Sequence, residues 1–174
     1  HPVAHSFPTR RSSDLYESIL RRTIRENIEL GITTPDEPLP IRSDMAKVGQ
    51  IIVNLAINAQ DAMPEGGTLG ITTSRVIIDD DNMHMSQELG PGEYALIQVS
   101  DTGKGIEEET LKYIFEPFYT TKKIGTGLGL STVYGIVKQQ NGSITVKSIP
   151  GKGTTFYVYL PISKSPLAAE DNLE

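Results

Sequence analysis

Two glycine-rich segments lie close together between Ser100 and Ser131, and they constrain the fold more than any other part of the chain. The first is Asp101-Thr-Gly-Lys-Gly105-Ile106, and the second is Gly125-Thr-Gly-Leu-Gly129-Leu130. Glycine has no side chain, so a flat or charged ligand can approach the backbone closely, and a neighbouring carboxylate can accept a hydrogen bond from an amine of that ligand. Either segment alone is a weak signal, because glycine-rich turns are common in ordinary loops. Together they favour a nucleotide site.

A helix is predicted upstream, from about Met45 to Met63, and it carries a polar stripe. Asp44 can cap this helix by accepting its free amide hydrogens, and Pro64-Glu-Gly-Gly67 ends it. Helical geometry places Asn54, Asn58 and Asp61 on one face, between two apolar flanks. The flanks are Val48, Ile51, Leu55 and Ala59 on one side, and Val53 and Ile57 on the other.

A polar stripe buried between two apolar flanks needs hydrogen-bond partners. A buried polar group without a partner costs about 1–3 kcal/mol, so several such groups need hydrogen bonds. They can bond to neighbouring backbone or to a ligand. For three groups in one stripe, with the glycine segments downstream, the ligand is favoured.

The remaining pattern alternates helices and strands. Helical spacing is expected over residues 15–25, 107–115 and 130–140, and strand spacing over 28–32, 39–42, 68–78 and 93–99, with a hairpin of 143–148 and 154–160. This order predicts the α+β class. The expected architecture is a two-layer α/β sandwich, in which one mixed sheet carries helices on one face.

The asparagine helix and the two glycine segments, in this order and spacing, resemble the ATP-binding domain of bacterial sensor histidine kinases. That superfamily also contains DNA gyrase B, Hsp90 and MutL. The resemblance runs from about Leu39 to Pro161. It implies the same architecture, the Bergerat ATP-binding fold, with ATP and Mg²⁺ as ligands. The pattern from Asn58 to Gly67 and a short lid resemble the nitrogen-regulation-like and hybrid subgroup.

The resemblance implies an adenine site around the first glycine segment. Asp101 accepts the exocyclic amine of adenine, whereas a lone aspartate before glycine is otherwise a turn residue. Gly103 and Gly105 let the base lie against the backbone, and Ile106 forms an apolar wall. Thr154 matches a position that reaches adenine through water. The alternative for Thr154 is an ordinary strand threonine.

At the other end of the ligand, the resemblance implies that Asn58 holds Mg²⁺ between the phosphates through its amide oxygen. Asn54 contacts phosphate or its water shell, and the role of Asp61 is left open. Thr120, Thr121 and Lys122 touch the γ-phosphate from a lid. The glycine segment at a helix N-terminus attracts anions through its free amides. Its residues are Gly125, Thr126, Gly127, Leu128, Gly129 and Leu130.

Phe115-Glu-Pro-Phe118 resembles a box of hinge aromatics beneath the lid. The alternative is simple core packing, which we expect to be the main role of Phe115.

The residue at position 54 differs from the one found in the ATP-hydrolysing relatives. Those proteins place a glutamate four residues before the metal-binding asparagine, and it activates the attacking water. With Asn54 there, water lacks a general base and hydrolysis is expected to be slow. Sensor kinases instead bring an acidic residue beside a histidine on a separate dimerising helix hairpin. The histidines here, His1, His5 and His84, are in no such pair, so no catalytic residue is assigned to this chain.

The predicted function is therefore that of the catalytic piece of a larger sensor kinase. It would transfer the ATP γ-phosphoryl group to a histidine on a separate dimerisation domain of the same parent, itself a homodimer. The parent would pass the group to an aspartate on a response regulator receiver domain. Two alternatives remain: a mechanical ATPase module like gyrase B or MutL, and a domain that only binds nucleotide.

Composition narrows the possible functions, and the chain ends suggest domain limits. The net charge of −6 argues against a nonspecific nucleic-acid binder. No apolar run is long enough to cross a membrane, so this segment is expected to be cytoplasmic and without membrane contact, whether or not the parent is membrane-anchored. Residues 7–15 read as a translated sequencing-adapter end, so residues 1–14 are expected to be an artefact, the alternative being a genuine arginine-rich linker. Residues 15–38 form a linker helix and first strand, 39–162 the ATP-binding domain and 163–174 a disordered tail or linker.

Overall fold

The computed structural model describes residues 5–6, 10–37, 39–41, 43–81, 89–119 and 129–162. The elements in chain order are β1 (His5–Ser6), α1 (Arg10–Thr23), β2 (Ile28–Thr33), β3 (Pro40–Ile41), α2 (Met45–Asp61), β4 (Gly67–Ile78), β5 (Gly92–Asp101), α3 (Glu108–Leu111), α4 (Gly129–Gln139), β6 (Ser143–Ile149) and β7 (Gly153–Pro161). None of the helices in the described ranges is long and apolar enough to span a membrane.

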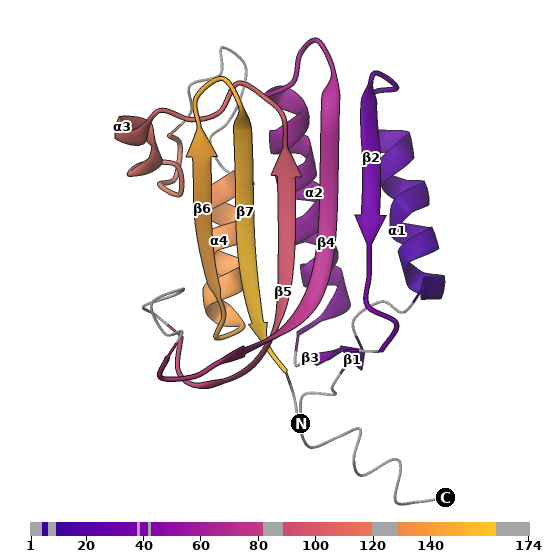
Figure 1. Cartoon of the computed structure of the whole chain (residues 1–174), viewed down its shortest axis with the longest axis vertical. Coiled ribbons are helices and arrows are strands. Elements are labelled where there is room, and N and C mark those ends of the chain that lie inside the picture. Colours follow the sequence, from indigo (N-terminus) through magenta and orange to yellow (C-terminus); the bar gives the residue numbers. More distant parts are fainter. Residues whose placement is uncertain are drawn as a thin grey trace, which may run out of the picture.

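One five-stranded sheet, in the order β2-β4-β5-β7-β6, forms the front layer of the molecule (Figure 1). β2 pairs with β4 in parallel, and every other neighbouring pair in this sheet is antiparallel. α1, α2 and α4 lie behind the sheet in Figure 1, all on one face. The predicted two-layer sandwich with a mixed sheet is therefore confirmed. The short strands β1 and β3 pair separately.

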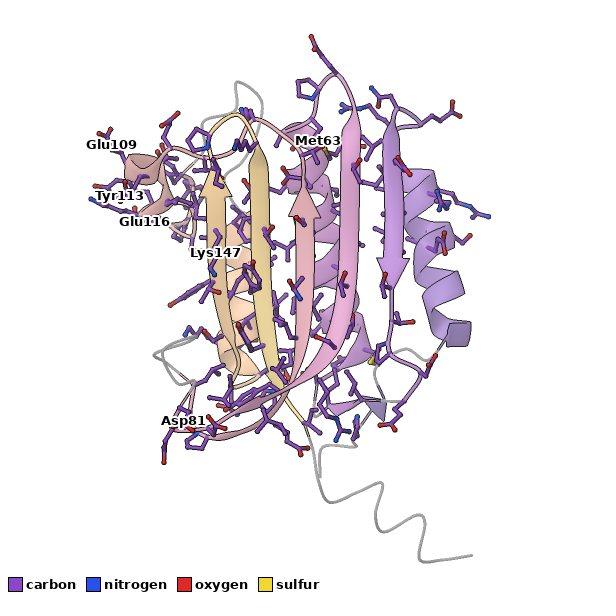
Figure 2. The ribbon with its side chains drawn as sticks, viewed as in Figure 1. Met63, Asp81, Glu109, Tyr113, Glu116 and Lys147 are labelled. Atoms are coloured by element: carbon purple, nitrogen blue, oxygen red, sulfur yellow. The ribbon has the colours of Figure 1, made fainter. Side chains whose placement is uncertain are left out.

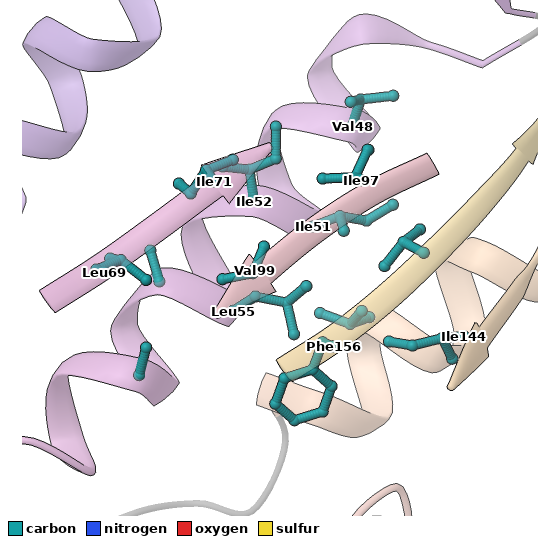
Figure 3. Close-up of a cluster of buried hydrophobic side chains, with 14 of the residues drawn as sticks. Val48, Ile51, Ile52, Leu55, Leu69, Ile71, Ile97, Val99, Ile144 and Phe156 are labelled. Carbon is teal, nitrogen blue, oxygen red and sulfur yellow. The ribbon is translucent and has the colours of Figure 1, made fainter. Parts of the chain in front are cut away.

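The main core lies between the helices and the sheet. Figure 3 shows Ile51 and Leu55 of α2 facing Ile97 and Val99 of β5, with Phe156 of β7 alongside. These side chains belong to one buried cluster, and Phe156 is only 1 % exposed. Alternation along β7 places every second residue in this core, because successive strand side chains point to opposite faces. The inward direction predicted for the Phe156, Val158 and Leu160 positions is confirmed.

The helix that carries the polar stripe begins as predicted. Asp44 is the N-cap of α2, and its carboxylate accepts a hydrogen bond of 2.9 Å from the backbone N–H of Ala46. This bond satisfies one amide that has no partner within the helix. α2 ends at Asp61, two residues before the expected end at Met63. Pro64 explains the early end, because a residue that precedes proline disfavours helical backbone angles.

Two other helices also differ from their predicted ranges. α1 covers Arg10–Thr23 rather than 15–25, since the residues before 15 contain neither glycine nor proline from Arg10 onward and do not interrupt the helix. α3 covers only Glu108–Leu111, and the chain continues to Phe118 as successive turns. Pro117 opposes a regular helix in that segment.

The expected burial of the polar stripe is wrong in one respect. The first apolar flank of α2 is buried, together with Ile52 and Ala56. The second flank is not, because Val53 is only partly buried and Ile57 is 38 % exposed. Asn54 and Asn58 are consequently half-buried and Asp61 is exposed. The helix presses one side against the sheet and leaves the stripe at the edge of an open face.

Candidate nucleotide-binding site

The predicted site residues that the structure describes gather at one end of the sheet. β5 ends there at Asp101, and β7 begins there at Gly153 (Figure 1). Because these strands are antiparallel, Asp101 lies directly opposite Thr154. Met63, just after α2, is labelled at the same end in Figure 2. α4 begins at Gly129, so the predicted position of that glycine at a helix N-terminus is confirmed.

Asp101, the last residue of β5, is buried, with 6 % exposure. Its Oδ1 accepts a hydrogen bond of 2.8 Å from the Gly103 N–H. Burial raises the pKa of Asp101, and the backbone hydrogen bonds from Gly103 and Thr154 lower it in part. These two bonds fix the direction of the carboxylate. The result is an oriented acceptor whose remaining lone pairs can receive an amine.

The glycines of the first segment are needed because backbone atoms approach them closely. A Cβ on Gly103 would lie 2.5 Å from the carbonyl oxygen of Ala62, and one on Gly105 would meet the carbonyl of Ile149. Gly105 also has a φ of +72°, which favours glycine. The segment is held from both sides, since Lys104 N–H donates to the Ala62 carbonyl at 3.1 Å and Lys104 C=O accepts from Gly151 at 2.7 Å.

Ser148 of β6 is a residue of this site that the sequence reasoning missed. Its hydroxyl accepts a hydrogen bond of 2.7 Å from the Ile106 N–H and donates one of 3.1 Å to the Gly153 carbonyl. It also shares a hydrogen bond of 2.8 Å with the Thr154 hydroxyl. Ser148 therefore joins the predicted apolar wall to the predicted threonine. The signal was its period-two spacing after Ile144 and Val146, which places a polar residue on the inner face.

We expect Ser148→Ala to lower the free energy of unfolding by about 1–3 kcal/mol, because the Ile106 N–H loses its acceptor in a half-buried position. Chemical denaturation measures this loss. Ser74→Ala is the matched control, because Ser74 lies in β4 on the other face of the sheet. Its free energy of unfolding should stay within about 0.5 kcal/mol of that of the unchanged protein. Equal stabilities for the two variants would contradict the role assigned to Ser148.

The polar stripe of α2 faces the start of α4. The Asn54 side chain donates a long hydrogen bond of 3.4 Å to the Gly129 carbonyl, which links residues 75 positions apart. Asn58 follows one helical turn later, and the described part of the chain offers its amide no hydrogen-bond partner. A half-buried amide oxygen fits Mg²⁺, which keeps several waters and takes further oxygens from phosphate. Across the described residues, no three His, Cys, Asp or Glu side chains are grouped to hold a metal ion.

Part of the predicted phosphate end lies outside the described residues. This part comprises Thr120, Thr121, Lys122, Gly125, Thr126, Gly127 and Leu128. Of the second glycine segment, Gly129 and Leu130 are described, and Leu130 packs against the main core. The described residues thus bring together Asn54 and Gly129 at one side, and Asp101, Gly103, Gly105, Ile106 and Thr154 at the other.

The aromatic segment before this region has two different parts. Phe115 packs against the core, with its ring centroid 5.4 Å from that of Tyr134 and 6.4 Å from that of Phe156. The core-packing role expected for Phe115 is confirmed. Phe118 is 75 % exposed and has a φ of +67°, which is uncommon for a bulky residue. Figure 2 labels Glu109, Tyr113 and Glu116 on α3 and the turns after it, which stand to one side of the sheet.

Comparison with known proteins decides the family. The profile of the histidine kinase-, DNA gyrase B- and HSP90-like ATPases matches residues 43–164, which is most of the chain. The chain belongs to this ATPase family. Its ATP-binding domain type was predicted from the asparagine helix and the glycine segments, and that prediction is confirmed at the level of family and fold.

Sensor kinases are prominent among the similar proteins of this ATPase family. Sensor kinase CckA of Brucella abortus is 45 % identical over 145 residues, which cover 82 % of this chain and 15 % of CckA. Sensor histidine kinase ZraS of Escherichia coli K12 is 39 % identical over 136 residues, covering 78 % of this chain and 26 % of ZraS. The chain therefore spans only a small part of these relatives.

Among solved structures, the nucleotide-free catalytic domain of histidine kinase ThkA superposes on this ATPase-family chain with a TM-score of 0.71. The sequences are 27 % identical, and the match covers 91 % of this chain and 95 % of that domain. The chain thus has the size and architecture of a histidine kinase catalytic domain.

Proposed function

We propose that this chain binds ATP and Mg²⁺ as the catalytic domain of a two-component sensor histidine kinase. It transfers the γ-phosphoryl group to a histidine on a separate dimerisation domain. The observation that carries the proposal is the oriented, buried carboxylate of Asp101 beside the glycine backbone of Gly103 and Gly105. The similarity to CckA and ZraS, both sensor kinases, supports the same assignment.

Adenine recognition follows from the chemistry of Asp101. An ionised carboxylate only accepts hydrogen bonds, so it selects the exocyclic amine of adenine. Guanine presents a carbonyl at that position, and two acceptors facing each other in a buried site are unfavourable. Ile106 supplies an apolar surface to the base, and Thr154 completes the polar contacts on the far side. Both are held in place by the Ser148 hydroxyl.

At the phosphate end, Asn58 is the residue that would hold Mg²⁺, with Asn54 one turn away toward the triphosphate. Mg²⁺ neutralises charge on the triphosphate when bound. The free amides at the start of α4 attract the same phosphates, and Thr120, Thr121 and Lys122 of the lid complete the contacts around the γ-phosphate. Asp61 lies at the exposed end of the stripe, and we assign it no role.

Asn54 also limits what this domain does alone. Its amide does not act as a general base, so water is not activated and steady hydrolysis is slow. In phosphoryl transfer, the bond from the γ-phosphorus to the oxygen of the leaving ADP breaks and a bond to an imidazole nitrogen forms, while the acidic neighbour of the histidine takes the imidazole proton. The acceptor histidine and this acidic neighbour come from the dimerisation domain, and the phosphoryl group goes on to a receiver domain. A homodimeric parent and a cytoplasmic location, where ATP is available, belong to the same proposal.

Mixing the chain with a separate histidine-bearing hairpin and γ-labelled ATP tests this function. A His→Gln form of the same hairpin is the matched control. The proposal expects acid-labile phosphohistidine on the intact hairpin, no label on the control and little free phosphate. Steady release of free phosphate would indicate a mechanical ATPase instead. ATP binding without either product would indicate a domain that only binds nucleotide.

A further inference from the structure

The turn between α1 and β2 holds the end of the helix that carries the asparagine stripe. Arg25 Nη2 donates hydrogen bonds to the Gln60 carbonyl at 3.1 Å and the Met63 carbonyl at 2.6 Å. The backbone N–H of Arg25 donates to the Gln60 side-chain oxygen at 2.7 Å. Two residues later, the Asn27 carbonyl accepts from the Gly67 N–H at 3.3 Å. The α1–β2 turn is thus joined at several points to the α2–β4 turn.

The same end of α2 supports the glycine segment beside Asp101. The Ala62 carbonyl, between the two carbonyls that Arg25 contacts, accepts the Lys104 N–H at 3.1 Å. Gly103 sits so close to that carbonyl that a Cβ there would lie 2.5 Å from the oxygen. Gly103 in turn donates to the Asp101 carboxylate at 2.8 Å. A displacement of Ala62 would therefore move the amide that orients Asp101.

Elementary helix chemistry explains why an arginine is useful at this point. The last carbonyls of a helix have no partner within the helix, and the C-terminal end carries partial negative charge. A cation with several donors satisfies both requirements. The Gln60 carbonyl also accepts the Met63 N–H, and the Met63 carbonyl accepts the Gly66 N–H, both at 3.0 Å. Arg25 is thus a second, charged donor to each carbonyl, and it ties the end of α2 to the α1–β2 turn. Asn58 and Ala62 both belong to that end of the helix.

We propose that Arg25 is a positioning residue of the nucleotide site: it fixes the end of α2, and through Ala62 and Gly103 it fixes the direction of the Asp101 carboxylate. Arg25 lies outside residues 43–164, which the family profile matches. The bonds from Arg25 to the Gln60 and Met63 carbonyls nevertheless make the α1–β2 turn part of the framework of the site. The consequence for ATP affinity rests on the proposed function, whereas the consequence for the glycine segment does not.

The test compares Arg25→Met, which keeps the aliphatic stem but removes the donors, with Arg25→Lys, which restores a cationic donor. Arg22→Met, at an exposed arginine of α1, is the matched control. For each variant of this chain, calorimetry measures the Kd for ATP with Mg²⁺. Amide hydrogen exchange measures the rate at Lys104 relative to Ile97 in the core of β5.

We expect Arg25→Met to raise the Kd by about 3- to 10-fold, and to speed Lys104 exchange relative to Ile97 by a similar factor. Arg25→Lys and Arg22→Met should stay within about twofold of the unchanged chain. If Arg25→Met does not fold, Arg25→Gln takes its place with the same expectation.

An unchanged Lys104-to-Ile97 ratio in the Met variant would overturn the inference, because Arg25 would then add only general stability. A Kd within twofold of the unchanged chain would overturn it equally. If the unchanged chain fails to bind ATP, the proposed function fails, and the exchange ratio alone decides the role of Arg25.

Discussion

Replacing Asp101 with alanine is expected to weaken ATP binding by about 10- to 150-fold. A hydrogen bond to a charged group contributes about 1.5–3 kcal/mol, and each 1.4 kcal/mol changes the Kd tenfold. The carboxylate is buried and held by the Gly103 and Thr154 amides, so alanine removes an acceptor whose direction is fixed. Calorimetric titration with ATP and with GTP measures the effect. The unchanged chain should prefer ATP, and the variant should lose that preference.

Glu107→Ala is the matched control, since this exposed acid follows the same glycine segment without a side-chain hydrogen bond at the helix cap. It should leave the Kd within about twofold of the unchanged chain, because exposed charges contribute little. If Asp101→Ala bound ATP as well as this control, adenine would lie elsewhere.

Asp101 should also leave a signature in the pH dependence of stability without nucleotide. Burial raises the pKa of this carboxyl above its ordinary value of 3.8, so the folded chain binds the proton more tightly than the unfolded chain does. The free energy of unfolding therefore falls as the pH rises from 3.8 to the raised pKa, and the loss is complete above it. Asp101→Asn should lack this component. Denaturation of both proteins across that pH range gives their free energies of unfolding. A difference between the two proteins that stayed the same at every pH would contradict a raised pKa of Asp101.

Removing the Asn58 amide is expected to have the second large effect. Asn58→Ala should reduce the gain in ATP affinity that Mg²⁺ provides by about 10- to 100-fold, the range associated with damage to a metal site. The side chain is half-buried without a hydrogen-bond partner among the described residues, so stability should change by less than about 1 kcal/mol. Titrations of ATP with and without Mg²⁺ separate this loss from a general loss of nucleotide binding.

Asn58→Asp serves as the comparison, because it keeps an oxygen ligand at the same position. It should retain a clear dependence on Mg²⁺. An alanine variant that still bound ATP more tightly with Mg²⁺, by the same factor as the unchanged chain, would place the metal on other residues.

Local patterns in the sequence predicted the fold well where neighbouring residues determine the structure. Alternation identified the strands of the hairpin, and Asp44 identified the start of α2. The angular positions on α2 were also right, but the burial of its second flank was wrong. A helical wheel gives directions around a helix and contains no information on which direction meets the sheet. Ile57 therefore looked like core and is 38 % exposed.

The supports of the site were harder to predict because they depend on distant pairing. Ser148 meets Ile106 only because β6 and β7 turn back beside the end of β5. Arg25 meets Gln60 and Met63 only because β2 pairs in parallel with β4, which brings the α1–β2 turn next to the α2–β4 turn. No motif marks either residue. The glycine segments and the asparagines were visible because each forms a short pattern within one stretch of the chain.

Backbone amide shifts during titration with ATP and Mg²⁺ show whether the end of α2, the segment after β5 and the start of α4 border one nucleotide cleft. We expect saturable shifts at Asn58, Gly103, Ile106, Thr154 and Gly129. Residues on the outer face of the sheet, such as Gln98, should change little. Shifts centred on that outer face, or no shifts at saturating ATP, would contradict this single cleft.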